Sequence, residues 1–189
     1  MSTIVAVEKD GRVALATDTL VTVGSTASPN AITLPKVVRA DSALIGTAGL
    51  SVYYSLLREF FAGEERGGFT DEAEILRAFV AFWNFMREEY HFVNDQSADD
   101  DTTPFVDMEA EFIVASASGL FHVREILSVT RHQRFCAIGS GAGHAEGAAS
   151  VLYEQNLSAQ DIAHAAVDVA MKFDRASGGE VIVYELQER

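Results

Sequence analysis

The sequence has one cysteine, few basic residues and no long apolar run. Cys136 has no second cysteine to pair with, so an intrachain disulfide and a zinc site built on several thiolates are excluded. Lys and Arg number 14 against 28 Asp and Glu, which gives a formal net charge of -14 without a basic cluster on any segment. Such a chain repels phosphate backbones and anionic lipid, so we expect neither nucleic acid nor a membrane as a partner.

Targeting and cofactor signals are also missing. No segment approaches the roughly 20 apolar residues that cross a bilayer, and no basic segment followed by an apolar stretch opens the chain, so we expect a cytoplasmic protein. The five histidines lack metal-ligand spacing such as HExxH, and there is no GxxxxGK[ST] phosphate-binding loop. Cys136 lies in the apolar segment RFCAIGS, which is typical of a small buried core residue.

The first part of the chain has the alternation of a sheet. With 189 residues and 48% of them apolar, the chain predicts one domain over residues 1–189, with Met1 removed and no long propeptide. Two β-branched segments, 3–9 and 12–18, flank Asp10-Gly11 and predict a hairpin. Short extended stretches around Lys36 and Leu44 continue the sheet.

Helical and extended patterns then alternate. Two amphipathic helices are expected, one beginning at Ser51 and a longer one opened by Thr70 and Asp71. The acidic stretch 94–107 follows and predicts a solvated loop. Extended segments return after it, with a turn at Ser118-Gly119.

The last third completes the pattern. Helices are predicted over 142–154 and from Ser158 to about Phe173, with Ser158 and Asp161 forming a capping box, and a final strand follows at EVIVYEL. Strands, two helices, strands, two helices and a strand predict an α+β fold, a four-layer αββα sandwich of two antiparallel sheets flanked by helix pairs.

The start of the chain offers a candidate nucleophile. Met1 precedes the small residue Ser2, so removal of the methionine would leave Ser2 with both a hydroxyl and a free α-amine. The pKa of an α-amine is about 7.7 to 8.0, so a useful neutral fraction exists near neutral pH. An N-terminal hydroxyl residue that uses its own amine as the base is a known variant of nucleophilic catalysis.

Several motifs in fixed order resemble the proteasome β-subunit and HslV peptidase family of N-terminal nucleophile hydrolases. The resemblance covers nearly the whole chain and points to a bacterial proteasome-homologue branch. A serine stands where that family usually has threonine. The motifs are Ser2-Thr3-Ile4-Val5, LATDTLVTVG around Asp18, Lys36-Val37, LIGTAG, IGSG at Ser140, and DRASGG from Asp174 to Gly179.

The resemblance implies roles for individual residues. Ser2 would be the nucleophile, Asp18 and Lys36 a buried charge pair beside it, and Gly46 the donor of an oxyanion-hole amide. Hydrogen bonds around the amine are implied for Ser140, Asp174 and Ser177. The residues implied to line an apolar substrate pocket are Val21, Leu34, Val38, Leu44 and Ala48. No cofactor is required, and a structural cation is implied at the carbonyls of Met171, Asp174 and Ser177.

The same resemblance implies an assembly. Two stacked rings of six or seven identical subunits would enclose the sites, and unfolded polypeptides would be the substrates. Folded substrates would need an ATP-driven AAA+ unfoldase as partner, since this chain has no phosphate-binding loop of its own. Two alternatives stay open from the sequence. One is an amidase of the same fold that acts on a small amide, and the other is a catalytically latent, ring-forming structural or binding protein whose site is degenerate or permanently blocked.

Overall fold

The hairpin at the start of the chain is the centre of the first sheet. The computed structural model describes residues 2–23, 26–28, 35–40, 42–61, 67–90 and 107–186. In it, β1 (Thr3–Lys9) pairs antiparallel with β2 (Arg12–Asp18). Asp10 and Gly11 connect them with φ of 52° and 74°, the positive values that a two-residue hairpin turn requires. The predicted hairpin is confirmed.

The first sheet is completed by strands from the end of the chain. Its order is β10-β1-β2-β11, all antiparallel, with β10 at Phe135–Gly139 and β11 at Val181–Glu185. Both faces of β1 and β2 are covered: Ile4, Ala6 and Leu15 face the other sheet, and Val5, Val7, Ala14 and Ala16 belong to the cluster on the opposite side. Because β1 lies between β2 and β10, the first residues of the chain are held inside the sheet.

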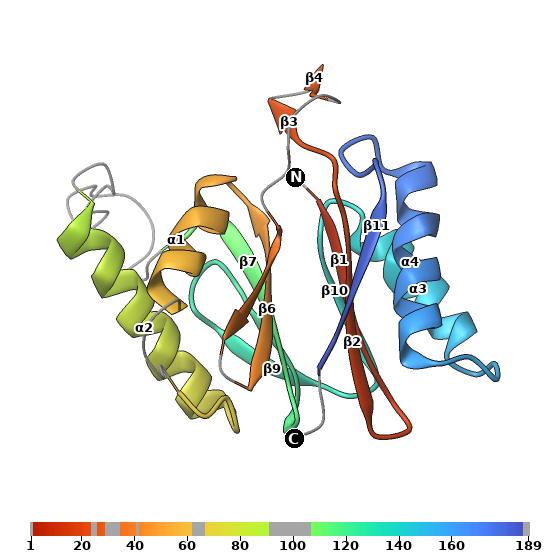
Figure 1. Cartoon of the computed structure of the whole chain (residues 1–189), viewed down its shortest axis with the longest axis horizontal. Coiled ribbons are helices and arrows are strands. Elements are labelled where there is room, and N and C mark those ends of the chain that lie inside the picture. The colour runs from red at the N-terminus through yellow and green to blue at the C-terminus, as the bar shows by residue number, and fades with distance from the viewer. Residues whose placement is uncertain are drawn as a thin grey trace.

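The second sheet contains five antiparallel strands in the order β5-β6-β7-β8-β9. A separate pair, β3 and β4, lies apart from both sheets near the N-terminus (Figure 1). The alternation of residues after Gly119 predicts one extended run there, but the chain turns at Leu127, which has a φ of 60°. The bounds are β3 Thr22–Val23, β4 Thr26–Ala27, β5 Val37–Ala40, β6 Ala43–Gly49, β7 Ala110–Ser116, β8 Gly119–Val123 and β9 Val129–His132.

Within the part of the chain that the structure describes, four helices lie where the sequence predicts them. Asp71 caps the second helix by accepting from the Glu74 amide, and Ser158 and Asp161 form the expected capping box on the fourth. The third ends two residues earlier than predicted. The bounds are α1 Val52–Phe61, α2 Glu72–Glu89, α3 Ala142–Leu152 and α4 Ala159–Phe173. No helix among the described residues is long and apolar enough to cross a membrane.

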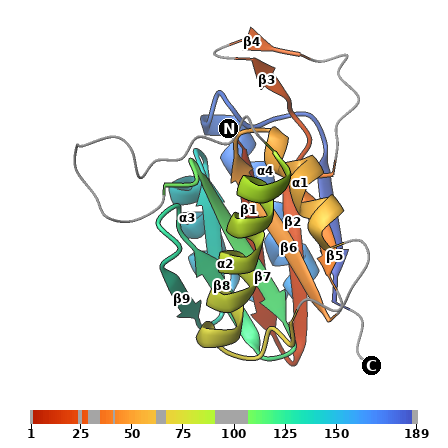
Figure 2. The same cartoon turned by 90° about the vertical axis from the view of Figure 1, so that its left-hand side faces the viewer.

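The elements stack in four layers (Figures 1 and 2). Helices α1 and α2 cover the five-stranded sheet through a core rich in phenylalanine, including Phe60, Phe79, Phe82 and Phe112. Helices α3 and α4 cover the other sheet through a core made mainly of alanine and valine, which lets these helices approach closely. A third apolar cluster fills the space between the sheets and contains Cys136. The predicted αββα sandwich and the buried cysteine are confirmed.

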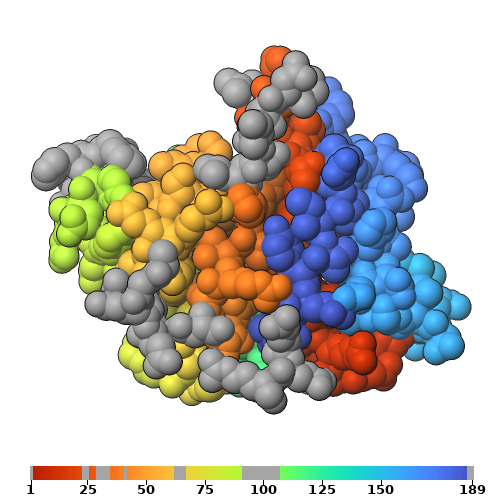
Figure 3. All heavy atoms as spheres, viewed as in Figure 1, coloured from red at the N-terminus to blue at the C-terminus, as the bar shows by residue number. Residues whose placement is uncertain are grey.

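The edge strands of the two sheets meet on one face. Arg39 of β5 donates from Nη2 to the Glu185 carbonyl oxygen of β11 at 3.2 Å. Figure 3 shows the atoms of these two strands side by side, with the tip of the β1–β2 hairpin emerging at the lower edge. The Ser2 end of β1 therefore lies at the opposite end of the sandwich from this hairpin tip.

Candidate functional site

The first residues of β1 are buried at one end of the two sheets. Ser2 is only 1% exposed, and its hydroxyl lies 3.4 Å from the hydroxyl of Tyr54 in the first turn of α1. Gly139 presses against the Ser2 carbonyl oxygen so closely that a Cβ there would lie 2.0 Å from it. Glycine at this position, with a φ of 89°, is what allows the chain to enclose Ser2.

A buried ion pair lies next to Ser2. Asp18 ends β2 and Lys36 directly precedes β5, and Lys36 Nζ donates to Asp18 Oδ1 at 2.8 Å with both side chains at most 1% exposed. Lys36 also donates to the Leu20 carbonyl at 3.0 Å. Asp18 Oδ1 accepts from the Thr3 amide at 3.0 Å, so the pair is tied to the residue that follows Ser2. The predicted residues Asp18 and Lys36 are thus brought together in space.

Burial and pairing have opposite effects on the pKa of Lys36. Desolvation lowers the pKa of Lys36, and the charge and hydrogen bond of Asp18 oppose that effect. Besides Lys36, the Asp18 carboxylate accepts from three backbone amides, those of Thr3, Leu20 and Gly178. A carboxylate with this many donors is a stable counter-charge for a buried lysine.

A second carboxylate, Asp174, organises a hydroxyl network at the same end of the sheet. Its Oδ2 accepts from Ser140 at 2.6 Å and from Ser177 at 2.7 Å. A hydroxyl has one proton, so Ser177 accepts from Thr3 Oγ1 at 2.6 Å. Burial alone would raise the pKa of Asp174, but the hydrogen bonds from Ser140, Ser177 and the Ala176 amide outweigh it and lower the pKa. Ser140, Asp174 and Ser177 are brought together as predicted.

A cavity of about 430 Å³ lies at the same end of the molecule as the Tyr54 side chain that contacts Ser2. Tyr54 lines it and also contacts the Ser2 hydroxyl, so the cavity and the nucleophile candidate share one side chain. Most of the lining is apolar or small, and it comes from the segment after Asp18, the end of β6 and the start of α1. The lining residues are Leu20, Val21, Thr22, Gly49, Leu50, Ser51, Tyr54 and Glu109.

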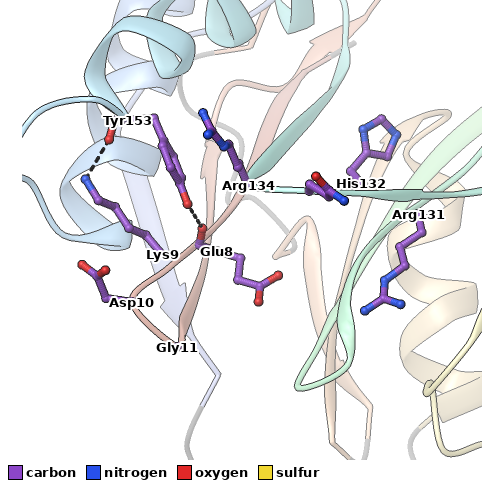
Figure 4. A pocket seen from close by; sticks show the side chains of 9 residues that line it. Glu8, Lys9, Asp10, Gly11, Arg131, His132, Arg134 and Tyr153 are labelled. Atoms are coloured by element: carbon purple, nitrogen blue, oxygen red, sulfur yellow. Dashed lines mark hydrogen bonds between the residues drawn. The ribbon is translucent and has the colours of Figure 1, made fainter.

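Another cavity, of about 500 Å³, lies at the hairpin end and differs in chemistry (Figure 4). Its cationic side chains are already engaged. Lys9 donates to the Tyr153 and Gln155 carbonyls, and Arg131 donates to the Ser118 carbonyl. The third cation, Arg134, pairs with Glu154. The other cavity is the one that shares a side chain, Tyr54, with the contact to the Ser2 hydroxyl.

The two glycines of LIGTAG occupy different surroundings. Gly46 lies inside β6 between the sheets, where a Cβ would come within 2.9 Å of Ile4. Gly49 ends β6, lines the cavity and has a φ of 147°. The assignment of an oxyanion donor to Gly46 stays a prediction, and the structure brings Gly49 to the cavity instead.

The predicted pocket residues are distributed unevenly. Val21 lines the cavity. Val38 packs in the core under α1 and α2, and Leu44 and Ala48 pack between the sheets. Leu34 and most of the acidic stretch 94–107 lie outside the described residues. Their pocket and loop assignments stay predictions.

The turn predicted to bind a cation is partly closed on itself. The Asp174 carbonyl oxygen accepts from the Ser177 amide at 3.3 Å, so one of the three implied carbonyls, those of Met171, Asp174 and Ser177, has a partner within the turn. Among the described residues, no group of three or more His, Cys, Asp or Glu side chains could hold a metal ion. The carbonyl cation site stays a prediction.

Two residues of this region were not assigned a role from the sequence. Thr3 links the chain start to Ser177 and Asp174 through its hydroxyl, and Tyr54 contacts Ser2. Helical spacing marks Tyr54 only as one of several buried residues of α1, because the pattern cannot separate a core position from a cavity wall. The contact with Ser2 is what distinguishes Tyr54 from the other buried residues of α1.

Comparison with known proteins gives whole-chain likenesses, although no family model matches the sequence. The structure of BPH from Thiobacillus denitrificans, a bacterial proteasome homologue, is 26% identical in sequence, with a TM-score of 0.82 over 99% of this chain and 100% of that one. A second structure of BPH, in complex with epoxomicin, has a TM-score of 0.84 at 26% identity over 98% and 100% of the chains.

The eukaryotic HslV from Trypanosoma brucei is 25% identical, with a TM-score of 0.69 over 98% of this chain and 99% of that one. These likenesses agree with the resemblance carried by the sequence motifs and with the order of the layers. The chain therefore has the N-terminal nucleophile hydrolase fold of the proteasome and HslV.

Proposed function

We propose that this chain is a peptidase of the proteasome and HslV type that uses Ser2, freed by removal of Met1, as its nucleophile. The observation that carries the proposal is the buried Asp18–Lys36 pair, which is tied through Thr3 to the start of β1 beside an apolar cavity. The likeness to BPH and HslV supports peptide-bond hydrolysis by this fold. The choice of Ser2 as the nucleophile and of its α-amine as the base goes beyond these likenesses and belongs to the proposal alone.

The chemistry follows from the groups at the chain start. The Ser2 α-amine takes the hydroxyl proton while Oγ bonds to the substrate carbonyl carbon. The amine then gives that proton to the departing peptide nitrogen as the C–N bond breaks, which leaves an acyl-serine ester. Water, deprotonated by the same amine, hydrolyses the ester and restores the hydroxyl. The positive charge of Lys36 disfavours protonation of the nearby amine and so keeps it a base near neutral pH.

Stabilisation of the oxyanion needs a backbone amide that faces the substrate. We propose as this donor the amide of Gly46, the glycine that the family resemblance implies, and Gly49, which ends the same strand, lines the cavity. A side chain at Gly49 would collide with the Glu109 carbonyl at 2.5 Å, which explains why this strand end needs glycine. Removal of one such donor from an active site typically slows catalysis about 100-fold or more.

The cavity supports a preference for an apolar side chain before the cut bond. Leu20, Val21 and Leu50 supply most of its apolar wall. The formal net charge of -14 disfavours acidic substrates, particularly where several subunits surround one chamber. Epoxomicin is bound in one of the BPH structures, and we propose that the same compound occupies this cavity.

Assembly is the second half of the proposed function. The likeness to HslV and BPH supports a homo-oligomer that encloses its sites. We propose a double ring, with six or seven subunits in each ring, that takes unfolded polypeptide from an AAA+ unfoldase. Cytoplasmic localisation belongs to the same proposal.

The decisive test uses the natural N-terminus. The protein is purified without a tag at its start, and intact mass establishes that Met1 is absent. Hydrolysis of an unfolded protein and of a peptide amide with an apolar residue before the cut is then measured. We expect activity in the processed protein, none in Ser2→Ala, and none in a form that keeps a residue before Ser2.

Ser150→Ala is the matched control, because Ser150 is an exposed hydroxyl of α3 that donates to the Gly147 carbonyl. Undiminished hydrolysis by Ser2→Ala would exclude Ser2 as the nucleophile. Cleavage of small amides without any cleavage of peptides would support an amidase of the same fold. A ring that carries Met1 and hydrolyses neither substrate would support a latent assembly.

A further inference from the structure

The hydroxyl of Tyr54 has an unusual position for a residue at the start of a helix. Its side chain is 6% exposed, and among the described residues its hydrogen-bond partner is the Ser2 hydroxyl, at 3.4 Å. A buried tyrosine hydroxyl normally finds a partner, and this one finds the group proposed to attack the substrate. The same ring forms part of the cavity wall.

The neighbouring tyrosine shows what an ordinary core position looks like. Tyr53 directs its hydroxyl to the Met108 carbonyl, away from the cavity, and packs against Phe82 and Phe112. Successive residues of α1 thus have different surroundings, one inside the phenylalanine core and one at Ser2. This pair allows the Tyr54 contact to be separated from the general effect of losing a buried hydroxyl.

A serine nucleophile has an orientation problem that threonine does not have. Serine carries one heavy atom on Cβ and can sample three χ1 rotamers, whereas the extra methyl of threonine restricts χ1. The hydroxyl of Thr3 is fixed by Ser177, but Ser2 has no such methyl or carboxylate-linked partner among the described residues. Attack requires one orientation of Oγ, so a loose rotamer lowers the rate.

We propose that Tyr54 is a positioning residue that holds the Ser2 hydroxyl in its attacking rotamer by donating a hydrogen bond to Oγ. The proposal rests on Ser2 being the nucleophile. Donation by Tyr54 leaves the Ser2 proton free to move to the amine. The contact is long, as hydrogen bonds of catalytic groups often are without substrate, and we expect it to shorten in the substrate complex.

The surroundings keep Tyr54 a donor. Burial raises the pKa of its phenol above the ordinary value, and the negative charge of Asp18 raises it further. The hydroxyl is therefore protonated through the whole range in which the Ser2 amine acts as a base. The contribution of Tyr54 should not change across this range.

A double-mutant cycle tests the proposal. In the processed parent, Tyr54→Phe should lower kcat about tenfold on a peptide amide, the order of one lost hydrogen bond, and leave KM within about twofold. In the Ser2→Thr background the same change should lower kcat less than twofold, because the threonine methyl already restricts χ1. Tyr53→Phe should leave kcat unchanged in both backgrounds.

An equal loss of kcat in the serine and threonine backgrounds would overturn the proposal, since Tyr54 would then act on substrate or fold. Crystal structures of the parent and Tyr54→Phe give a readout that needs no activity. We expect one Ser2 Oγ position in the parent and several in the variant, whereas a single unchanged position in both contradicts the proposal. Activity that survives Ser2→Ala would instead exclude Ser2 as the nucleophile. The failure of the Tyr54 proposal can therefore be distinguished from the failure of the proposed function.

Discussion

Asp18 combines an electrostatic and a structural task in one carboxylate. It pairs with Lys36 and also accepts from the amides of Thr3, Leu20 and Gly178, which fixes the start of β1 and the two connections next to it. Loss of the lysine leaves those three amide bonds in place. The two tasks can therefore be separated by mutation of Lys36.

We predict that Lys36→Ala abolishes peptidase activity, by at least about 100-fold, in a protein that still folds. The free energy of unfolding should fall by about 3 kcal/mol or less, because breaking a buried pair costs roughly 3–5 kcal/mol and three amides still solvate Asp18. Peptide hydrolysis and urea unfolding measure the two effects.

Lys172→Ala is the matched control, since Lys172 forms an exposed pair with Asp168 within α4. Both activity and stability should change little in this variant, as is usual for surface ion pairs. Full activity in Lys36→Ala would remove Lys36 from the site.

Thr47 presents the opposite case, a buried hydroxyl without a hydrogen-bond partner among the described residues. Its side chain is 1% exposed on β6. Thr47→Val keeps the shape and removes the unsatisfied oxygen, so we predict a gain of about 1 kcal/mol in the free energy of unfolding. Urea unfolding measures it against Thr130→Val on the exposed strand β9, and a loss of stability in Thr47→Val would show that the oxygen does have a partner.

Sequence and structure agree on the site to different degrees. Asp18, Lys36, Ser140 and the turn from Asp174 to Ser177 come from separate segments of the chain, and the resemblance of their motifs to the proteasome and HslV family grouped them. Tyr54 could not be assigned in this way, because helical spacing is the same for a core residue and for a residue in the wall of a cavity.

At the scale of elements, the sequence predicts correctly those features that depend only on neighbouring residues. The Asp10-Gly11 turn and the Ser158–Asp161 capping box both form as the sequence indicates. Strand β9 was not separated from β8, because it is a largely exposed edge strand whose residues lack a buried face. Its pairing depends on β8 and not on its own pattern.

We predict that Ser158→Ala lowers the free energy of unfolding by about 1 kcal/mol. The Ser158 hydroxyl accepts from the Asp161 amide at 3.1 Å, and α4 carries six buried residues of the alanine-rich core. The same substitution in the middle of a helix, Ser150→Ala in α3, should be neutral or slightly stabilising, because alanine favours helix. Equal losses in the two variants, measured by urea unfolding, would contradict the role of the cap.

For the whole molecule, charge opposes assembly. Each subunit has a formal net charge of -14, so the proposed ring would bring many like charges within a short distance. The apolar surface that drives association has to exceed this repulsion. Ionic strength changes the repulsion far more than it changes the apolar contacts.

We predict that the proposed ring is favoured by salt. Lowering ionic strength from about 0.15 M to about 0.01 M lengthens the screening distance from about 8 Å to about 30 Å, so the assembled fraction should fall. Native mass spectrometry or sedimentation measures that fraction. Sucrose in place of salt is the control, because it adds no screening, and an assembly that weakens as salt is added would contradict the prediction.

The central position of β1 has a consequence for timing during protein synthesis. Ser2 is enclosed by Gly139, and Thr3 by Ser177, which both leave the ribosome long after the hairpin. At about 5–20 residues per second, the interval from Asp18 to Ser177 lasts on the order of 10 to 30 s. The proposed removal of Met1 therefore has a window of this length before Gly139 and Ser177 enclose the two residues that follow it.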